Sequence, residues 1–410
     1  MSEPDDIPDP AGAGFDPDRL ANLAARMARY VDDGRLPGWS MLLARHGRIA
    51  ARTTYGLRDV DAGLPVERDT LFRIYSMTKP VTSVAAMALY ERGEFALSDP
   101  IARWLPDFAD MRVFAGGSDV RPVTVAATAP ITVWNLLTHT SGLTYGFHRA
   151  HPVDAMYRAA GYEWSAPPDA DLAAAVTTFA RMPLLFQPGA EWNYSVSTDV
   201  LGRLVEVITG QPLDEALRSL VLDPLGMHDT TFTVGEADAR RTAVLYIRDP
   251  INGRLRVNSA LGRTIFGPSW LSGGGGLAST IGDYHRFAQF LLGRGRLGDV
   301  RILGDRTMRF MTTNQLPGGV DLARFGRPLY AEAPFDGVGF GLGFAVELDP
   351  VATRVVSSAG EFGWGGAAST TFWVDPAEDL TFVFMTQLLP SSTYPLRNEL
   401  RQLIYTALVD

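Results

Sequence analysis

The chain has 410 residues, of which 46% are hydrophobic, and this length and composition predict a folded protein with a large core. It has no cysteine, which excludes disulfides, thiolate-held metal clusters and a cysteine nucleophile. With 46 acidic and 37 basic side chains and no basic stripe, nucleic acid is not expected as a partner, and a small neutral or cationic substrate fits better.

The amino-terminal residues 1–14 are acidic and rich in proline, without the basic start and apolar stretch of a secretory signal. We therefore expect a disordered segment there and a cytoplasmic protein. The longest apolar runs of the chain are shorter than a membrane span requires, so no association with a membrane is expected.

Strand patterns occur at both ends of the chain, and helical patterns lie mainly between them. Strands are expected at 39–45, 48–56, 339–348, 369–376 and 380–387, with a tight turn at His46-Gly47. Helices are expected at 16–32, 77–92, 169–181, 198–209, 213–222 and 396–409. Joined, the two strand groups predict an α/β (α+β) fold whose antiparallel sheet has about five strands, flanked by the two terminal helices and interrupted by a mostly helical insertion.

Ser76 and Lys79 stand three residues apart at the expected start of the helix over 77–92. In a helix this spacing puts both side chains on one face, with Cβ atoms about 5–6 Å apart. A serine hydroxyl needs a base to become a nucleophile, and a lysine kept neutral by burial or by a cationic neighbour can be that base. The free N–H groups at the helix start would favour negative charge at Ser76. Without further motifs, a serine and a lysine at this spacing are more often a helix N-cap and a solvated lysine. The rest of the sequence must therefore decide whether Ser76 and Lys79 are catalytic.

Two further stretches supply that context. Tyr194 lies in an extended run before a helix, and a phenol beside a lysine ammonium would lose its proton more readily and act as a general base. Ala367 follows Gly365 and Gly366 in a glycine-rich approach to a strand, and its N–H could stabilise an oxyanion together with the N–H of Ser76. The plainer interpretations are a core tyrosine and a strand entry with a β-bulge.

Three short motifs thus follow one another along the chain. They are Ser76-Met77-Thr78-Lys79, Tyr194-Ser195-Val196 and Trp364-Gly365-Gly366. Their types and order resemble the serine β-lactamase and penicillin-binding protein superfamily, and within it the family VIII carboxylesterases. The stretches LLTHTSGLTYG, LDPLGMHDT and SGGGGLASTIGDYHRF are similar to the family as well, so the resemblance covers about residues 15 to 408.

The resemblance implies a β-lactamase/transpeptidase-like fold with an active site in the cleft between two domains. We expect a sheet domain of residues 15–75 plus 265–410 and a mostly helical domain of residues 76–264. It also implies that Trp364, Gly365 and Gly366 bind substrate, and the aromatic residues Tyr145 and Trp270 are further candidates for the pocket.

Two departures from the class C β-lactamase pattern indicate the subclass. Val196 stands where those enzymes carry an asparagine, and a valine cannot hydrogen-bond a substrate amide. Trp364 stands where they carry a lysine that engages the β-lactam carboxylate, so a charge-assisted contact is lost. Both changes favour neutral esters over anionic β-lactams, and weak cephalosporin hydrolysis stays open.

The sequence therefore predicts a serine carboxylesterase for short to medium acyl chains. Ser76 would carry the acyl group, and Lys79 and Tyr194 would exchange the proton. The prediction includes no cofactor and no metal, and the protein would be a monomer or a small homo-oligomer. An acyltransferase, an amide or β-lactam hydrolase similar to D-amino-acid peptidases, and a non-catalytic ligand-binding relative remain alternatives.

The sequence contains no GxSxG elbow, and its six histidines show no metal-binding pattern. His139, His148, His151 and His285 could be imagined in a triad or a metal site. For each of them, a surface position or a structural hydrogen bond is the better interpretation.

Overall fold

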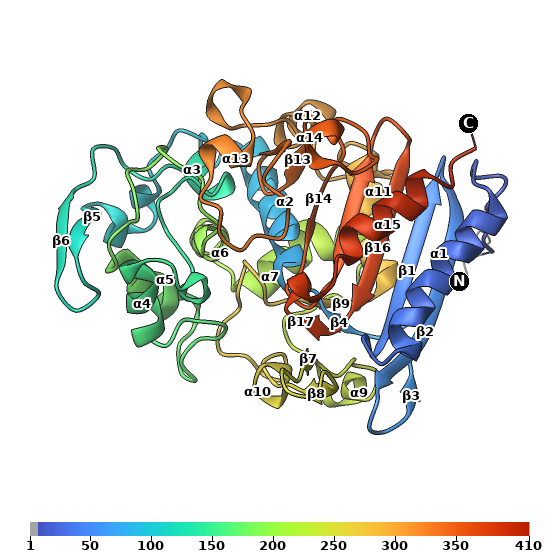
Figure 1. The fold of residues 1–410 in the computed structure, drawn as a ribbon. Helices are drawn as coiled ribbons and strands as arrows, with labels where there is room; N and C mark the ends of the chain where they lie inside the picture. Colours follow the sequence, from blue (N-terminus) through green and yellow to red (C-terminus); the bar gives the residue numbers. More distant parts are fainter. Residues whose placement is uncertain (1–6, 410) are drawn as a thin grey trace.

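The computed structural model describes residues 7–409, and its central feature is an antiparallel sheet with the strand order β12-β13-β14-β15-β16-β1-β2-β3 (Figure 1). The strands are β1 (Gly38–Arg45), β2 (Arg48–Asp59), β3 (Leu64–Pro65), β12 (Val338–Phe340), β13 (Ala345–Glu347), β14 (Phe362–Gly365), β15 (Thr371–Asp375) and β16 (Leu380–Thr386). Because β1 pairs with β16, the two ends of the chain share one sheet, as the sequence predicted.

The sheet has eight strands, and the prediction of about five was too low. The run 339–348 forms the two strands β12 and β13, because its glycines allow a reversal in which Gly343 adopts a left-handed φ of 93°. The glycine-rich run 362–365 forms β14 through pairing with β13 and β15. The local sequence has only a weak preference for extended structure, and pairing with neighbouring strands compensates for that weakness.

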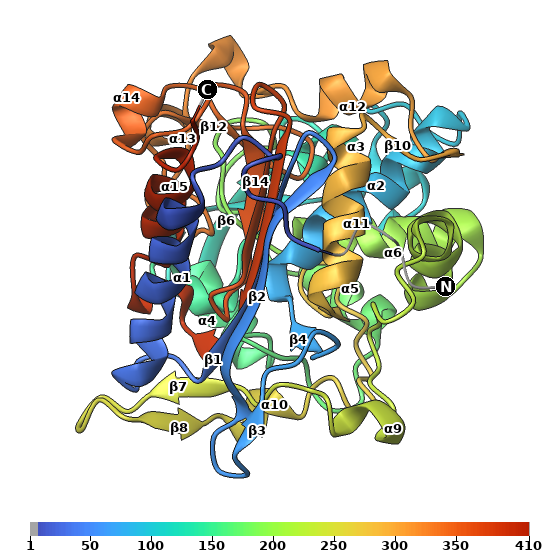
Figure 2. The same cartoon turned by 90° about the vertical axis from the view of Figure 1, so that its right-hand side faces the viewer.

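Helices cover both faces of the sheet, as Figure 2 shows. On one face lie α1 (Pro17–Asp32) and α15 (Leu396–Tyr405), which contact each other. On the other face lie α11 (Ile281–Leu292) and, beyond it, α2 (Thr78–Glu91). The central strands are therefore buried on both sides.

The alternation of side chains along β1 explains how one strand serves both layers. Trp39, Met41 and Leu43 pack into the core beneath α1 and α15. Leu42 and Ala44 pack into the core on the opposite face. Successive side chains of a strand point to opposite faces, so a strand covered on both sides is apolar throughout.

The turn between β1 and β2 matches the prediction. His46 and Gly47 both have positive φ values, 54° and 71°. Two such residues are what a tight hairpin needs to follow the twist of its strands.

The start of the described chain differs from the prediction. Residues 7–14 were expected to be disordered, yet Ala13 is fully buried in the core under α1, and the Asp9 N–H donates to the Ile49 carbonyl at 2.8 Å. The apolar Ala13 and this hydrogen bond to β2 hold the segment against the sheet. Residues 1–6 lie outside the described residues.

Of the remaining elements, α3, α5 and α6 lie beside the sheet on the α2 side, whereas β7, β8, α9 and α10 lie below it in the views of Figures 1 and 2. The helices are α3 (Val133–Leu137), α4 (Pro152–Ala159), α5 (Leu172–Ala180), α6 (Ser197–Thr209), α7 (Leu213–Leu217), α8 (Asp223–Leu225), α9 (Glu236–Ala239), α10 (Ser259–Gly262), α12 (Asp305–Met311), α13 (Leu322–Phe325) and α14 (Pro350–Thr353). The short strands are β4 (Phe72–Arg73), β5 (Arg112–Gly117), β6 (Pro122–Ala126), β7 (Tyr246–Arg248), β8 (Leu255–Val257), β9 (Ala278–Ser279), β10 (Arg296–Leu297), β11 (Val300–Arg301) and β17 (Leu388–Leu389).

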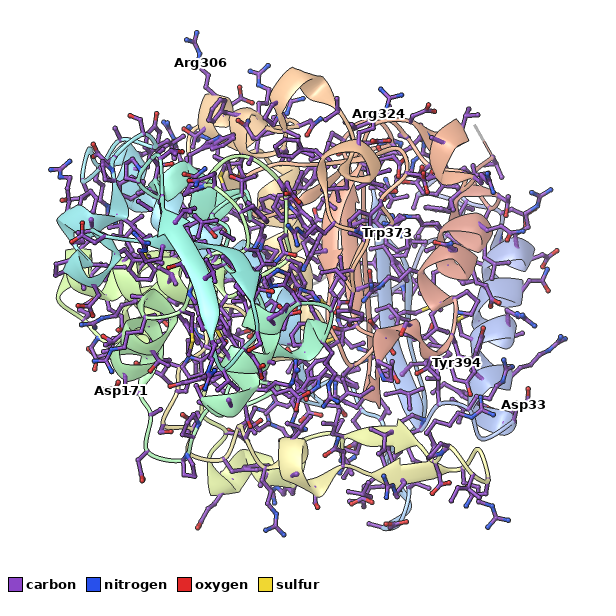
Figure 3. The ribbon with its side chains drawn as sticks, turned by 60° about the vertical axis from the view of Figure 1, so that its left-hand side comes forward. Asp33, Asp171, Arg306, Arg324, Trp373 and Tyr394 are labelled. Carbon is purple, nitrogen blue, oxygen red and sulfur yellow. The ribbon has the colours of Figure 1, made fainter. Side chains whose placement is uncertain are left out.

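Side-chain placement follows the same layers. In Figure 3 the charged residues Asp33, Asp171, Arg306 and Arg324 lie on the outside, whereas Trp373 of β15 is fully buried. Within residues 7–409, no helix is long and apolar enough to cross a membrane.

Candidate active site

Ser76 lies in a single turn of 3₁₀-helix, Tyr75–Met77, immediately before α2. Tyr75 adopts a φ of 43°, in the left-handed region, which costs a residue with a side chain roughly 1–2 kcal/mol. The surrounding structure must therefore hold this turn in place. Only 9% of Ser76 is exposed, and the residue lines a cavity. The serine is presented by a strained and well-supported turn.

Lys79 is buried in the first turn of α2, within contact of Ser76. Its Nζ donates to Ser76 Oγ at 3.2 Å and to the Gly274 carbonyl at 2.7 Å. Burial lowers the pKa of Lys79 to about 7, against the opposing effect of the carboxylates of Asp199 and Glu332. Because α2 is buried on nearly every side, the ammonium has little solvent to stabilise its charge. At neutral pH a large fraction of this lysine is a free amine.

Tyr194 lies across from Lys79, whose Nζ is 4.5 Å from the centroid of the tyrosine ring. The Tyr194 hydroxyl accepts a hydrogen bond from Trp364 Nε1 at 3.3 Å, and the Ser76 and Trp364 side chains both act to lower its pKa. Burial raises the pKa of Tyr194 well above its usual value, and the negative charge of Glu332 adds to the effect. The prediction that Tyr194 loses its proton readily was therefore wrong: the cost of burying a phenolate dominates.

Asp199, in the first turn of α6, was not anticipated from the sequence. Its Oδ1 accepts from Ser272 Oγ at 2.5 Å and from the Gly274 N–H at 3.2 Å. Burial raises the pKa of this carboxyl. Asp199 thus holds the loop whose Gly274 carbonyl accepts a hydrogen bond from Lys79. In the sequence, only the run of four glycines at 273–276 indicated that this loop approaches other groups closely.

The glycine-rich motif lies directly beside the Ser76 turn. The Gly366 N–H donates to the Thr370 carbonyl at 2.9 Å, which closes a tight loop after β14, and Thr370 Oγ1 donates to the Ile74 carbonyl at 3.4 Å. A Cβ at Gly366 would collide with that Ile74 oxygen. This close approach requires glycine and brings Ala367 to the wall of the Ser76 cavity.

The cavity has a volume of about 290 Å³ and is mainly apolar. Of the predicted site residues, Ser76, Ala367, Tyr145 and Trp270 line it. Trp364 does not: it lies behind Tyr194, on the wall of a second cavity of about 370 Å³. Gly365 and Gly366 are likewise not among the lining residues, because their neighbours Arg397 and Ile74 occupy the space beside them.

Aromatic rings form one side of the cavity. The ring of Tyr145 stacks on Phe147 with centroids 4.5 Å apart, and Phe147 stacks on Trp164 at 4.4 Å. Trp270, which also lines the cavity, meets Tyr162 edge to face at 6.0 Å. Trp164, at the outer end of the stack, is 38% exposed. The rings therefore extend from the neighbourhood of Lys79 toward the surface.

The histidines near the site make structural hydrogen bonds. His139 Nδ1 is 3.2 Å from Ser195 Oγ, and His148 Nε2 is 2.7 Å from the Tyr194 carbonyl. Burial lowers the pKa of both imidazoles. They brace the segment that carries Tyr194.

Comparison with known proteins identifies the family. The sequence pattern of the Beta-lactamase family matches residues 23–406. This chain belongs to that family. It is 34% identical to Esterase EstB of Burkholderia gladioli over 420 residues, covering 97% of this chain and 98% of that protein. It is 30% identical to the monacolin J acid methylbutanoyltransferase of Aspergillus terreus over 402 residues, covering 93% of each chain.

A solved structure agrees with the fold. That structure, "EstCE1, a hydrolase with promiscuous acyltransferase activity", matches with a TM-score of 0.80 at 26% identity, over 95% of this chain and 99% of the other. The β-lactamase-like fold and the family VIII esterase resemblance, both predicted from three motifs, are confirmed.

Proposed function

We propose that this chain is a serine carboxylesterase that forms an acyl-enzyme at Ser76. The observation that carries the proposal is the contact between Ser76 Oγ and Lys79 Nζ at 3.2 Å, together with a Lys79 pKa of about 7. A nucleophile in contact with a base that is partly neutral at physiological pH suits acyl transfer. Similarity to Esterase EstB along nearly the whole chain supports an ester as the substrate.

In the acylation step, Ser76 Oγ forms a bond to the ester carbonyl carbon while its proton passes to the free amine of Lys79. The oxyanion accepts hydrogen bonds from the backbone N–H groups of Ser76 and Ala367. The carbon–oxygen bond to the alcohol then breaks, and the alcohol leaves with the proton that Lys79 held. Water repeats the sequence on the acyl-enzyme, which releases the acid and restores the Ser76 hydroxyl.

Tyr194 acts in this scheme as a neutral phenol. The Ser76 side chain acts to lower its pKa, but burial raises that pKa more, so the phenol stays protonated at neutral pH. A neutral phenol can donate to the leaving alkoxide and be reprotonated by Lys79, which makes it a proton relay.

The cavity favours neutral esters with short to medium acyl chains. Its lining is mostly apolar and aromatic, and Val196 contributes a side chain that cannot hydrogen-bond. At the third motif the buried Trp364 supplies no cation for a β-lactam carboxylate.

The test is hydrolysis of p-nitrophenyl butyrate by the wild-type protein, Ser76→Ala and the matched control Ser83→Ala. Ser83 is also buried, on α2, but does not line the cavity. We expect turnover to vanish in Ser76→Ala and to persist in Ser83→Ala. A serine-reactive phosphonate should add mass to the wild type and not to Ser76→Ala. Equal turnover in all three proteins would show that Ser76 is not the nucleophile.

Acyl transfer to an alcohol is a second candidate, favoured by similarity to the methylbutanoyltransferase and to EstCE1. It uses the same acyl-enzyme and differs only in the group that attacks it. Adding a competing alcohol and measuring the ratio of new ester to free acid separates the two functions. Turnover of a cephalosporin or an anilide, but not of esters, would favour an amide or β-lactam hydrolase. A protein that the phosphonate does not label would be a ligand-binding relative.

A further inference from the structure

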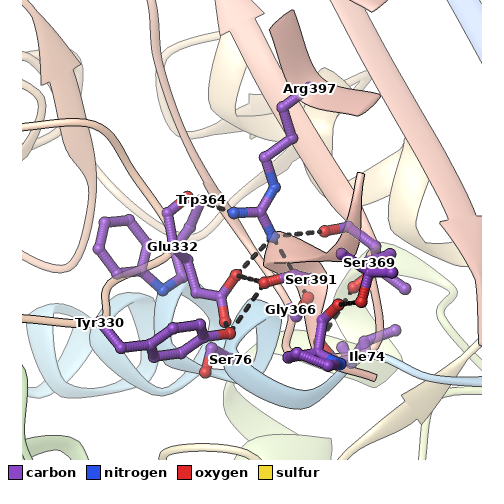
Figure 4. Close-up of polar contacts among 12 residues, drawn as sticks. Ile74, Ser76, Tyr330, Glu332, Trp364, Gly366, Ser369, Ser391 and Arg397 are labelled. Carbon is purple, nitrogen blue, oxygen red and sulfur yellow. Dashed lines mark hydrogen bonds and ion pairs between the residues drawn. The ribbon is translucent and has the colours of Figure 1, made fainter. Parts of the chain in front are cut away.

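The loop that carries Ala367 is tied to the C-terminal helix by Arg397, as Figure 4 shows. Arg397 reaches from the first turn of α15, and its Nη2 donates to the carbonyls of Gly366 and Thr370, both at 3.2 Å. A Cβ at Gly365 would collide with the same guanidinium, which explains a glycine there. The side chain therefore lies against the loop from the side opposite Ser76.

A buried carboxylate holds the guanidinium in this position. The Glu332 side chain is fully buried and forms an ion pair with Arg397 Nη2, while Arg397 Nη1 donates to the Glu332 carbonyl at 2.7 Å. Ser391 Oγ at 3.0 Å and the Tyr330 hydroxyl also donate to the Glu332 carboxylate. Glu332 and Tyr330 both line the Ser76 cavity, so this network connects the helix α15 to the site.

The geometry of one peptide unit turns this contact into an effect on Ala367. The Gly366 carbonyl and the Ala367 N–H belong to the same peptide group, which is planar and trans, so the two bonds point in opposite directions. A carbonyl held toward Arg397 directs the N–H away from it, and Ala367 lines the Ser76 cavity. A cation bonded to the carbonyl also polarises the peptide and makes its N–H a stronger donor.

We propose that the Arg397–Glu332 pair positions the oxyanion hole, holding the Gly366–Ala367 peptide so that its N–H faces the ester carbonyl. Arg397 is thus a positioning residue that acts through a backbone carbonyl and touches no substrate. The inference rests on the proposed function, because it assigns a part of the same reaction.

A second arginine on the same helix provides a matched control. Arg401 lies one turn later and pairs with Glu361, with Nε to Oε1 at 2.8 Å. The side chains of Arg397 and Arg401 are 20% and 19% exposed, and each bonds to a buried glutamate. Glu361 precedes β14 and Gly366 follows it, so the two arginines hold opposite ends of one strand. Only the Arg397 end faces Ser76.

The experiment compares Arg397→Ala with Arg401→Ala in thermal unfolding and in ester hydrolysis at pH 9. At that pH Lys79 is neutral, so changes in its charged surroundings do not disturb the comparison. We expect both variants to unfold at lower temperature. Arg397→Ala should also lose roughly 10–100-fold in kcat with little change in KM, because the oxyanion forms only in the transition state. Arg401→Ala should keep kcat within about twofold, since its pair is remote from the reacting atoms.

Two further measurements keep the proposal falsifiable if Arg397→Ala folds poorly. Guanidinium ion at a few tens of millimolar should enter the second cavity, which Arg397 lines, and restore kcat of Arg397→Ala but not change that of Arg401→Ala. Arg397→Lys should have a kcat between those of the wild type and Arg397→Ala, because a lysine keeps the positive charge but lacks the several N–H donors of the planar guanidinium. Equal losses of kcat in the two alanine variants, or a normal kcat in Arg397→Ala, would overturn the proposal. Absence of Ser76-dependent turnover in the wild type would instead overturn the proposed function, and the inference with it.

Discussion

Two sides of one cavity are built on different principles. The side to which the proposed function assigns the chemistry, called the catalytic side, has Ser76, Gly274 and Ala367 in the cavity wall. Lys79 and Tyr194 are buried next to that wall, and Lys79 hydrogen-bonds Ser76 and the Gly274 carbonyl. The aromatic side consists of Tyr145, Phe147, Tyr162, Trp164 and Trp270, whose rings contact one another in two groups, the first of Tyr145, Phe147 and Trp164 and the second of Tyr162 and Trp270. The function of the first side depends on the protonation states of its side chains and on the direction of its hydrogen-bond donors. The function of the second side depends on the shape of the cavity and on the apolar area that it offers to a substrate.

The difference predicts how each side tolerates substitution. A change on the catalytic side removes a charge, a proton acceptor or a directed donor, so it should lower the rate for every ester. A change on the aromatic side alters the volume of the cavity, so it should change KM and the preference among esters.

Replacing Lys79 with Met should have the largest effect among variants that keep the nucleophile. Methionine keeps most of the volume but cannot accept a proton, so we expect kcat/KM to fall by roughly 10³–10⁴-fold. Because Lys79 is buried and its charged form is disfavoured, the thermal unfolding temperature should not fall. Steady-state kinetics and calorimetry check both expectations, and a loss of less than tenfold would remove Lys79 as the base.

Replacing Tyr194 with Phe should cost roughly 10²-fold in kcat, because the proton relay is lost while the ring remains. Tyr246→Phe is the control, since that hydroxyl also accepts a hydrogen bond within the protein, from the Val60 N–H at 2.8 Å, but Tyr246 packs in the other core, beneath α1 and α15. The two variants should have similar unfolding temperatures. If Tyr194→Phe hydrolysed esters at the wild-type rate, Tyr194 would have no part in proton transfer, and Lys79 would carry it out alone.

The pH dependence follows from the pKa of Lys79. As the proposed base, Lys79 works in its neutral form, so kcat/KM should rise about tenfold per pH unit below the pKa of about 7 and level off above it. Asp199→Asn removes a negative charge that raises this pKa, so the rising limb should move to lower pH. The groups that face Lys79 are Asp199, Glu332, Tyr145, Tyr194 and His139. A rate that does not change between pH 5 and 9 would contradict a titrating lysine.

On the aromatic side, Trp270→Leu should have the smallest effect. It removes part of the aromatic lining without touching the hydrogen bonds of Ser76, so kcat for p-nitrophenyl acetate should stay within about threefold. KM for larger esters should change by several fold, because area in contact with the substrate is lost. A series of p-nitrophenyl esters of increasing chain length measures the shift. A uniform loss over the whole series would place Trp270 on the catalytic side.

The local sequence patterns determined several features of this protein. Apolar periodicity predicted α1, α6 and α15, and the His46-Gly47 pair predicted the turn between β1 and β2. Three short motifs predicted the family, since their residue types and order are rare in combination. The structure brings Ser76, Lys79, Tyr194 and Ala367 around one site, although they are spread over nearly 300 residues.

Other features were decided only by the tertiary structure, because they depend on which groups surround a side chain. The low pKa of Lys79 and the high pKa of Tyr194 come from burial, which no local pattern expresses. Glu332 and Arg397 lie in no motif, and only the fold brings Arg397 into contact with both Glu332 and the Gly366 loop. Strands such as β14, whose sequence has little strand pattern, form because the neighbouring strands pair with their backbone N–H and carbonyl groups. The sequence determined which residues could react, and packing decided their protonation and direction.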